Sequence, residues 1–133
     1  MAKLYRVIVP VTDIEVAAQF YGQVLETPGE RVSPGRHYFH CDGTVLACYD
    51  PARDGDQLSY GWQMHENQYL YFAVEDLSKV RGLLKKAGAS ALGKVQAMPW
   101  GETLLYAKDP FGNPISFVDS KTVFTGTSKS SKK

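Results

Sequence analysis

The stretch most informative about this fold is Asp109-Pro110-Phe111-Gly112-Asn113-Pro114-Ile115, near the end of the chain. Pro110 presets the backbone at a turn, and Gly112 permits a positive φ. Apolar strand residues resume at Ile115. The stretch therefore predicts a tight turn that leads into a last strand over residues 114–119.

A related pattern stands earlier in the chain. Gly43 lies 69 residues before Gly112, and each glycine is followed by an apolar strand pattern that ends at an aspartate. Asp13, which follows an apolar run, lies 63 residues before Asp76, which follows a similar run. Two matches in the same order predict that the chain contains a duplicated module.

Periodicity assigns the elements of each module. Residues 13–26 and 76–87 have the apolar spacing of helices. Either Asp13 or a capping box of Thr12 and Glu15 begins the first helix, and Gly88 ends the second. Strands are predicted over 4–11, 31–41, 44–50, 69–75, 92–98, 102–108 and 114–119, with a short strand near 58–62 and a hairpin turn at Asp42-Gly43.

These elements predict an α+β fold, with two βαβββ modules in tandem whose curled mixed sheets form a cup-shaped cavity. A single module of this size cannot bury both faces of its sheet, whereas two modules together can. The chain has 133 residues, which predicts one domain. The expected domain is 1–124, with modules at about 4–50 and 68–120, a connection over 51–67 and a flexible Lys/Ser-rich tail over 125–133.

Composition excludes several classes of function. The net charge of +1 offers no global field for nucleic acid or an anionic membrane. The chain has no apolar run of about 18 residues, which a membrane span requires, and no signal-peptide pattern at its start. Cys41 and Cys48 do not form a disulfide framework. We therefore expect a cytoplasmic protein with free thiols.

Three pieces of the sequence, in order, resemble the vicinal oxygen chelate superfamily of glyoxalases, bleomycin-resistance proteins and extradiol dioxygenases. They are Val11-Thr12-Asp13-Ile14 with Gln19-Phe20-Tyr21, then Phe72-Ala73-Val74-Glu75-Asp76-Leu77, then the stretch from Asp109 to Ile115. The resemblance covers roughly residues 4–120, and it implies the paired modules and the cup.

The resemblance also implies four positions for ligands of a divalent metal, which here carry Arg6, Ala47, Tyr69 and Ser116. Arginine stays protonated and has no lone pair to give, neutral Tyr and Ser are poor ligands, and Ala is none. A register shifted by one residue would place Tyr5, Gln68, Ile115 and Phe117 there, of which only Gln68 could bind a metal. We therefore expect no metal and no cofactor.

Other residues that could bind a metal are His37, His40, Cys41, Cys48 and His65. His37 and His40 are three residues apart, so on a strand they point to opposite faces and cannot chelate together. Cys48 points away from the cup if Ala47 faces it, and then packs as a small hydrophobe.

Strand alternation predicts which side chains line the cup. The candidate ligand-binding residues are Arg6, Tyr49, Tyr69, Tyr71, Trp100, Glu102 and Ser116. Arg6 either binds a ligand through its carboxylate or phosphate group, or forms an ion pair with an internal acid such as Glu102. The tyrosines either bind ligand or pack within the sheets. Trp100 borders the cup and Trp62 lies in the connection between the modules, or both lie in the core or in a dimer interface.

The favoured function is a metal-independent small-molecule binding protein that resembles the drug-sequestering bleomycin-resistance branch. Its partner would be a small aromatic or drug-like molecule, and the resemblance implies a homodimer. The alternative is a glyoxalase- or dioxygenase-like lyase or isomerase with a non-standard or metal-free active site. A third hypothesis is a homologue that acts by binding other proteins through the lysine-rich tail. The residues do not name the ligand.

Overall fold

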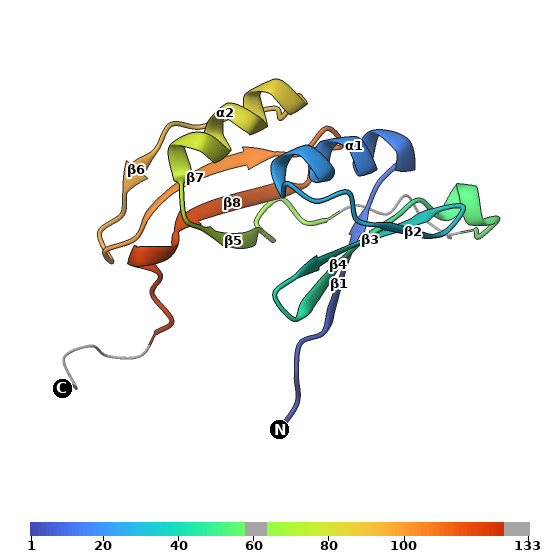
Figure 1. Cartoon of the computed structure of the whole chain (residues 1–133), viewed down its shortest axis with the longest axis horizontal. Helices are drawn as coiled ribbons and strands as arrows, with labels where there is room; N and C mark the ends of the chain where they lie inside the picture. Colours follow the sequence, from blue (N-terminus) through green and yellow to red (C-terminus); the bar gives the residue numbers. More distant parts are fainter. Residues whose placement is uncertain (58–63, 127–133) are drawn as a thin grey trace.

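The computed structural model describes residues 1–57 and 64–126 of the chain, and it confirms the α+β fold with two tandem modules (Figure 1). Module one contains β1 (Arg6–Pro10), α1 (Ile14–Val24), β2 (Glu30–Ser33), β3 (Arg36–Cys41), β4 (Thr44–Tyr49) and the 3-10 helix η1 (Pro51–Asp54). Module two contains β5 (Leu70–Val74), α2 (Leu77–Ala87), β6 (Gln96–Ala97), β7 (Thr103–Lys108), β8 (Pro114–Asp119) and η2 (Ser120–Thr122).

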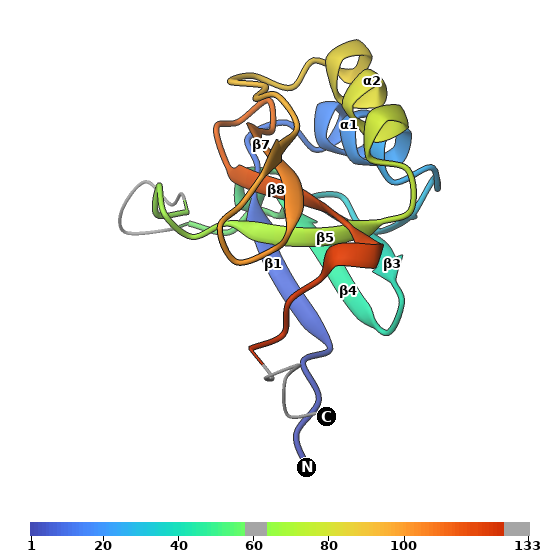
Figure 2. The ribbon, with the colours of Figure 1, turned by 90° about the vertical axis from the view of Figure 1, so that its left-hand side faces the viewer.

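The two modules have the same sheet topology, as expected for a duplication. The strand orders are β1-β4-β3-β2 and β5-β8-β7-β6. In each sheet the first strand pairs in parallel with the last, and the remaining pairs are antiparallel. Helices α1 and α2 lie side by side over the sheets (Figures 1 and 2). The sheets are not closed into one barrel, an arrangement consistent with a curled, open cup.

Short polar residues set the helix boundaries. The Asp13 carboxylate accepts hydrogen bonds from the backbone N–H groups of Glu15 and Val16, so Asp13 is the cap, rather than Thr12. Asp76 caps α2 in the same way, through Lys79 N–H. Gly88 ends α2 at a φ of 95°, as predicted.

Two strand predictions are wrong in their extent. The strand predicted over 31–41 is two strands, β2 and β3, because Pro34-Gly35 makes a turn between them. The strand predicted over 92–98 is reduced to Gln96–Ala97. Pro99, just beyond it, has no N–H to donate to a sheet. The short strand predicted near 58–62, Trp62 and residues 127–133 lie outside the described residues.

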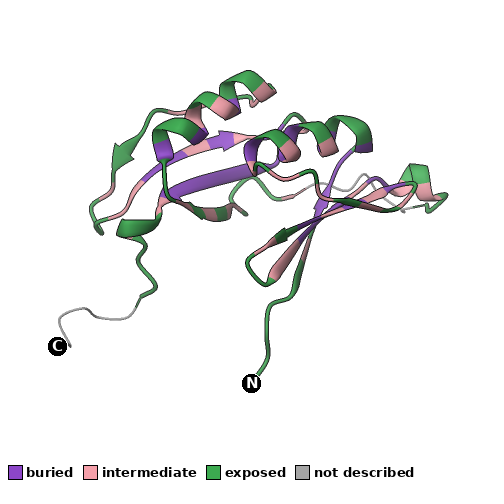
Figure 3. Ribbon diagram, in the orientation of Figure 1, coloured by how far each residue is buried: buried purple, intermediate pink, exposed green. Residues whose placement is uncertain are grey.

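One hydrophobic core joins the two modules. It includes Val9, Phe20 and Phe39 from module one and Leu105 and Phe117 from module two, each at most 1% exposed. Figure 3 shows the buried positions along the strands beneath the helices. Because both helices cover this core, neither module packs independently of the other. No helix of the described residues is long and apolar enough to cross a bilayer.

The turn stretch from Asp109 to Ile115 forms a polar joint between the modules. The fully buried Asp109 carboxylate accepts hydrogen bonds from Tyr21 Oη–H of α1 at 2.7 Å and from the Asn113 side chain at 2.8 Å. Asn113 Nδ2 also donates to the Pro10 carbonyl at the end of β1, at 2.8 Å. Gly112 supplies the positive φ, 86°, that the turn requires.

Candidate functional site

The sheet register places one set of side chains on the side of module one opposite the helices. This module-one face consists of Arg6, Ile8, Arg36, Tyr38, Ala47 and Tyr49, with Ala47 between Ile8 and Tyr38 in the register. The face carries a pocket of about 380 Å³, which Val32 and Ser33 of β2 also line. The predictions that Arg6, Ala47 and Tyr49 share one face are confirmed.

Arg6 is held on this face by aromatic residues. Its guanidinium donates hydrogen bonds to Tyr38 Oη at 3.0 Å and to Tyr5 Oη at 3.1 Å. The guanidinium carbon also lies 5.1 Å from the centroid of the Tyr5 ring and 5.9 Å from that of the Tyr38 ring, within the range of cation–π attraction. No carboxylate among the described residues forms an ion pair with Arg6.

Arg36, the second arginine of the pocket, is paired with carboxylates of the protein. Its Nη1 lies 2.6 Å from an Asp54 carboxylate oxygen, and its guanidinium carbon lies 4.1 Å from the centroid of the Tyr49 ring. Tyr49 Oη–H donates to Asp56, and this hydrogen bond raises the pKa of Tyr49. Arg36 and Tyr49 therefore form a fixed wall of the pocket.

The corresponding side of module two carries a cluster of tyrosines. Tyr69, Tyr71 and Tyr106 have ring centroids 5.1 to 6.4 Å apart, with the rings tilted or edge to face. Burial, a hydrogen bond with Tyr71 and the nearby charge of Glu102 raise the pKa of Tyr106 to about 12. We call Tyr69, Tyr71, Tyr106 and Glu102 the module-two face.

Three further candidates lie in module two. Ser116 is fully buried, and its hydroxyl donates to the Leu105 carbonyl at 3.0 Å. The Trp100 indole N–H donates to Glu102 at 2.8 Å, and the other oxygen of Glu102 accepts from the Phe124 N–H at 3.0 Å. Glu102 therefore does not pair with Arg6, and the hypothesis of an Arg6–Glu102 ion pair is wrong.

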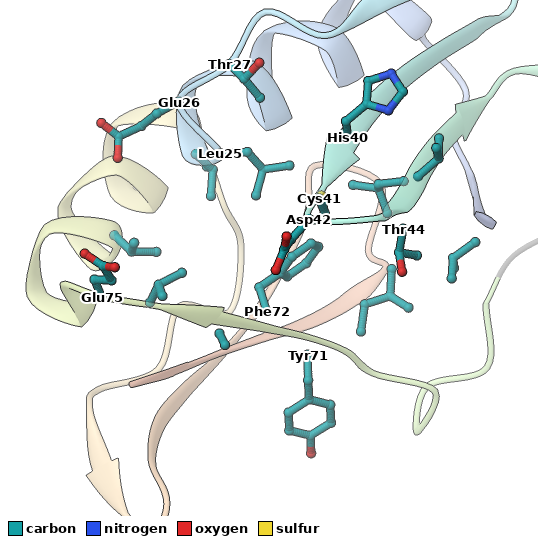
Figure 4. Close-up of a pocket in the computed structure, with 18 of the residues that line it drawn as sticks. Leu25, Glu26, Thr27, His40, Cys41, Asp42, Thr44, Tyr71, Phe72 and Glu75 are labelled. Carbon is teal, nitrogen blue, oxygen red and sulfur yellow. The ribbon is translucent and has the colours of Figure 1, made fainter. Parts of the chain in front are cut away.

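A larger cleft, of about 930 Å³, lies between the β3–β4 hairpin and β5 (Figure 4). Core side chains such as Val7, Leu46 and Phe72 line it. Its only lysine among the described lining residues, Lys79, is paired with Glu26 at 3.0 Å. Tyr69 and Tyr71 of the module-two face also line this cleft, so the cleft and that face share residues. In Figure 4 the Tyr71 side chain lies on the far side of β5 from the other labelled residues.

The histidine and cysteine positions follow the predicted alternation. His37 lies with the core and His40 on the opposite side of β3, where it is exposed. The His37 ring contacts Arg31 Nε at 3.1 Å and the Pro28 carbonyl at 2.8 Å. Burial raises the pKa of the Cys48 thiol. Within residues 1–57 and 64–126, no three His, Cys, Asp or Glu side chains are grouped to hold a metal ion.

The sequence analysis missed three residues of these faces, Arg36, Tyr38 and Tyr106, and also Tyr5, whose hydroxyl contacts Arg6. The alternation that assigned Ala47 and Tyr49 also applies to β3 and β7, and would have identified the first three. Because residues 31–41 were predicted as one strand, Arg36 was not recognised as the first residue of β3. Tyr5 precedes β1 and reaches Arg6 through its hydroxyl, which alternation does not predict.

Comparison with known families identifies the fold. The family model of the "Glyoxalase/Bleomycin resistance protein/Dioxygenase superfamily" matches residues 3–117. The chain belongs to this superfamily. The family model does not separate its glyoxalase, bleomycin-resistance and dioxygenase branches. No curated protein shows significant similarity to the chain.

Solved structures of superfamily members have the same fold. A glyoxalase-related enzyme from Fulvimarina pelagi has a TM-score of 0.73 and 19% identity, covering 96% of each chain. A glyoxalase/bleomycin resistance protein from Albidiferax ferrireducens T118 has a TM-score of 0.68 and 21% identity, and the match covers 86% of this chain and 95% of that protein. A lactoylglutathione lyase from Agrobacterium tumefaciens has a TM-score of 0.67 and 16% identity, and the match covers 91% of this chain and 96% of that protein. Identities this low establish the fold alone.

The residues at the positions that the resemblance implies for metal ligands do not form a suitable ligand set. Arg6 and Ala47 offer no donor atom, and the Ser116 hydroxyl is fully buried and bound to a carbonyl. A register shifted by one residue fails as well, because Ile115 and Phe117 are fully buried in the core. The chemistry of these side chains, in either register, does not support the metal centre of the superfamily's enzymes.

Proposed function

We propose that this superfamily member binds a small aromatic molecule without a metal ion, in the manner suggested by the name of the bleomycin-resistance branch. The observation that carries the proposal is the pocket of about 380 Å³ on the module-one face. Arg6 and Ala47, two of the four positions that the resemblance implies for metal ligands, line this pocket, and its walls are aromatic rings and guanidinium groups. Apolar and aromatic walls with a few fixed polar groups are typical of sites for small organic ligands.

The composition of the pocket favours a flat ligand. Ala47 presents one methyl group at the centre of the sheet, between the larger Ile8 and Tyr38. A ring placed over Ala47 would contact the side chains of Ile8 and Tyr38. Aromatic contacts of this kind contribute about 0.5–1.5 kcal/mol each beyond the burial of area.

A thermal-shift and calorimetric screen of planar aromatic compounds tests the proposal, with tag-free protein before and after treatment with EDTA. We expect binding that raises Tm by mass action and survives EDTA. Tyr38→Ala removes one wall and should weaken binding, whereas Val16→Ala on the exposed side of α1 should not. Binding lost with EDTA, or unchanged in Tyr38→Ala, would contradict the proposal.

We further propose that two copies of the chain associate through the faces opposite the helices. Large apolar side chains stand exposed there, including Tyr5 at 58%, Ile8 at 48% and Tyr71 at 55%. β1 and β5 are both edge strands, and each sheet is hydrogen bonded only within itself among the described residues. A second copy would cover these side chains and bring a module-two face opposite a module-one face.

Light scattering coupled to size-exclusion chromatography tests this association. The wild-type chain should elute with twice the mass of one chain. Ile8→Lys should yield a monomer, because it would bury a further cation beside Arg6 and Arg36 in the interface. Val16→Lys, at an exposed apolar position on α1, should stay dimeric. A monomeric wild-type chain would refute the homodimer.

A further inference from the structure

The two arginines of the module-one pocket differ in how their charges are balanced. Arg36 lies 2.6 Å from Asp54 and 3.9 Å from Asp56, so carboxylates of the protein already neutralise it. Among residues 1–57 and 64–126, the hydrogen-bond acceptors of the Arg6 guanidinium are the hydroxyls of Tyr5 and Tyr38 only. In the described part of the pocket, Arg36 is therefore paired with carboxylates and Arg6 is not.

We infer that the ligand is a planar aromatic acid, a carboxylate or an equivalent monoanion, and that Arg6 binds its acid group. This inference rests on the proposed function and adds the chemical class of the ligand. It also assigns an orientation, with the acid group toward β1 and the ring over Ala47 toward Tyr49.

The unused donors around Arg6 support an acceptor-rich group. A guanidinium has five N–H donors, and the two tyrosine hydroxyls use two of them. Both hydroxyls act as acceptors toward Arg6, so their own O–H groups remain able to donate. Arg6, Tyr5 and Tyr38 thus present donors that have no acceptor in the part of the chain that the structure describes, and a carboxylate accepts through both oxygens.

The charges on the far side of the pocket limit the ligand to one negative charge. Asp54 and Asp56 flank Arg36 and would repel a second anionic group placed there. The Arg36 guanidinium is also stacked on the Tyr49 ring, which orients it as a wall. A cationic ring would meet the unbalanced charge of Arg6, so like-charge repulsion disfavours it.

Three probes of nearly equal shape test the inference: 2-naphthoate, 2-naphthamide and 2-naphthylmethylammonium. We expect wild-type protein to bind 2-naphthoate at least about tenfold more tightly than the amide, and the ammonium least. Arg6→Gln should abolish the preference for naphthoate over the amide. Arg6→Lys should keep part of it, because lysine retains the charge without the planar fork. Raising the salt concentration should weaken only the binding of naphthoate.

Arg53→Gln is the matched control, because Arg53 is also exposed but lies outside the pocket, 3.8 Å from Glu15. It should keep the wild-type preference, and circular dichroism should show every variant folded. Equal binding of naphthoate and amide, or a preference that survives Arg6→Gln, overturns the inference while the proposed binding function stands. Failure of all three probes to bind overturns both.

Discussion

The two modules have the same strand order and the same pairing pattern, yet their faces opposite the helices differ in chemistry. The module-one face is cationic and hollow, with Arg6 and Arg36 around a pocket. The module-two face carries phenol groups and the acid Glu102, and its central residues Ser116 and Val118 are at most 3% exposed. The central residues of both faces are buried, with Ala47 at 2% and Ser116 at 0% exposure, so the two faces differ chiefly in the charge and chemistry of the side chains around them.

This difference shows how a duplicated backbone can carry two chemistries. The helix-facing residues, such as Phe39 and Phe117, are constrained because both modules share one core. Side chains on the opposite faces have no such constraint, and can diverge without cost to the core. The following predictions test how independent the two faces are, from the largest expected effect to the smallest.

Replacing Asp109 should destabilise both modules together. Asp109→Ala leaves Tyr21 Oη–H and the Asn113 side chain without their acceptor inside the protein. We expect a loss of about 3 kcal/mol or more in the free energy of unfolding, measured by urea denaturation. The transition should remain cooperative, because the joint belongs to both modules.

Asp119→Ala is the matched control for this joint. Asp119 accepts a hydrogen bond from Lys121 N–H at the start of η2, on the surface. Its loss should cost about 1 kcal/mol. Equal effects of the two substitutions would show that the buried joint does not hold the modules together.

Replacing Arg36 should affect stability more than replacing an arginine outside the pocket. Arg36→Gln removes the ion pair with Asp54 and should cost about 1 kcal/mol, because Arg36 is partly exposed to solvent. Arg53→Gln should cost less than about 0.5 kcal/mol. A larger loss in Arg53→Gln would refute this account of the pocket wall.

The same substitution should change the acid dependence of stability. Burial alone raises the pKa of Asp54, but the hydrogen bonds from Ser33 and Gly35 and the charge of Arg36 outweigh it, so the pKa is lowered. Asp54 therefore contributes stability above its ordinary pKa, and this contribution is lost as the pH falls through the lowered value. Thermal unfolding between neutral and acidic pH should show a smaller loss in Arg36→Gln than in wild type.

The module-two face should titrate abnormally at alkaline pH. Tyr106 has a pKa of about 12 against an ordinary 10.0, so it should ionise later than an ordinary tyrosine in a titration followed by tyrosinate absorbance, with Tyr106→Phe as the difference. Because the raised pKa means that the folded state retains the proton longer, stability falls as the pH rises from 10 to about 12. Glu102→Gln should lower the pKa of Tyr106. A titration unchanged in Tyr106→Phe would contradict the assignment.

The sequence predicted much of the backbone, and the reason is local. Asp76, Gly88 and the Asp42-Gly43 turn act on their immediate neighbours, so the α2 boundaries and the β3–β4 hairpin follow from residue type. Alternation placed Arg6, Ala47 and Tyr49 on one face. The prediction failed where short turns compete with strands, at Pro34-Gly35 and around β6.

The pairing of charges was decided by the tertiary structure. Sequence alone left Arg6 either with a ligand or with an acid such as Glu102, because both residues were expected to border the same cup. In the structure the Glu102 carboxylate accepts hydrogen bonds from the Trp100 indole and the Phe124 N–H, and Arg6 donates to the hydroxyls of Tyr5 and Tyr38. Which partner a long side chain reaches depends on the packing of distant strands, and spacing along one strand carries no information about that.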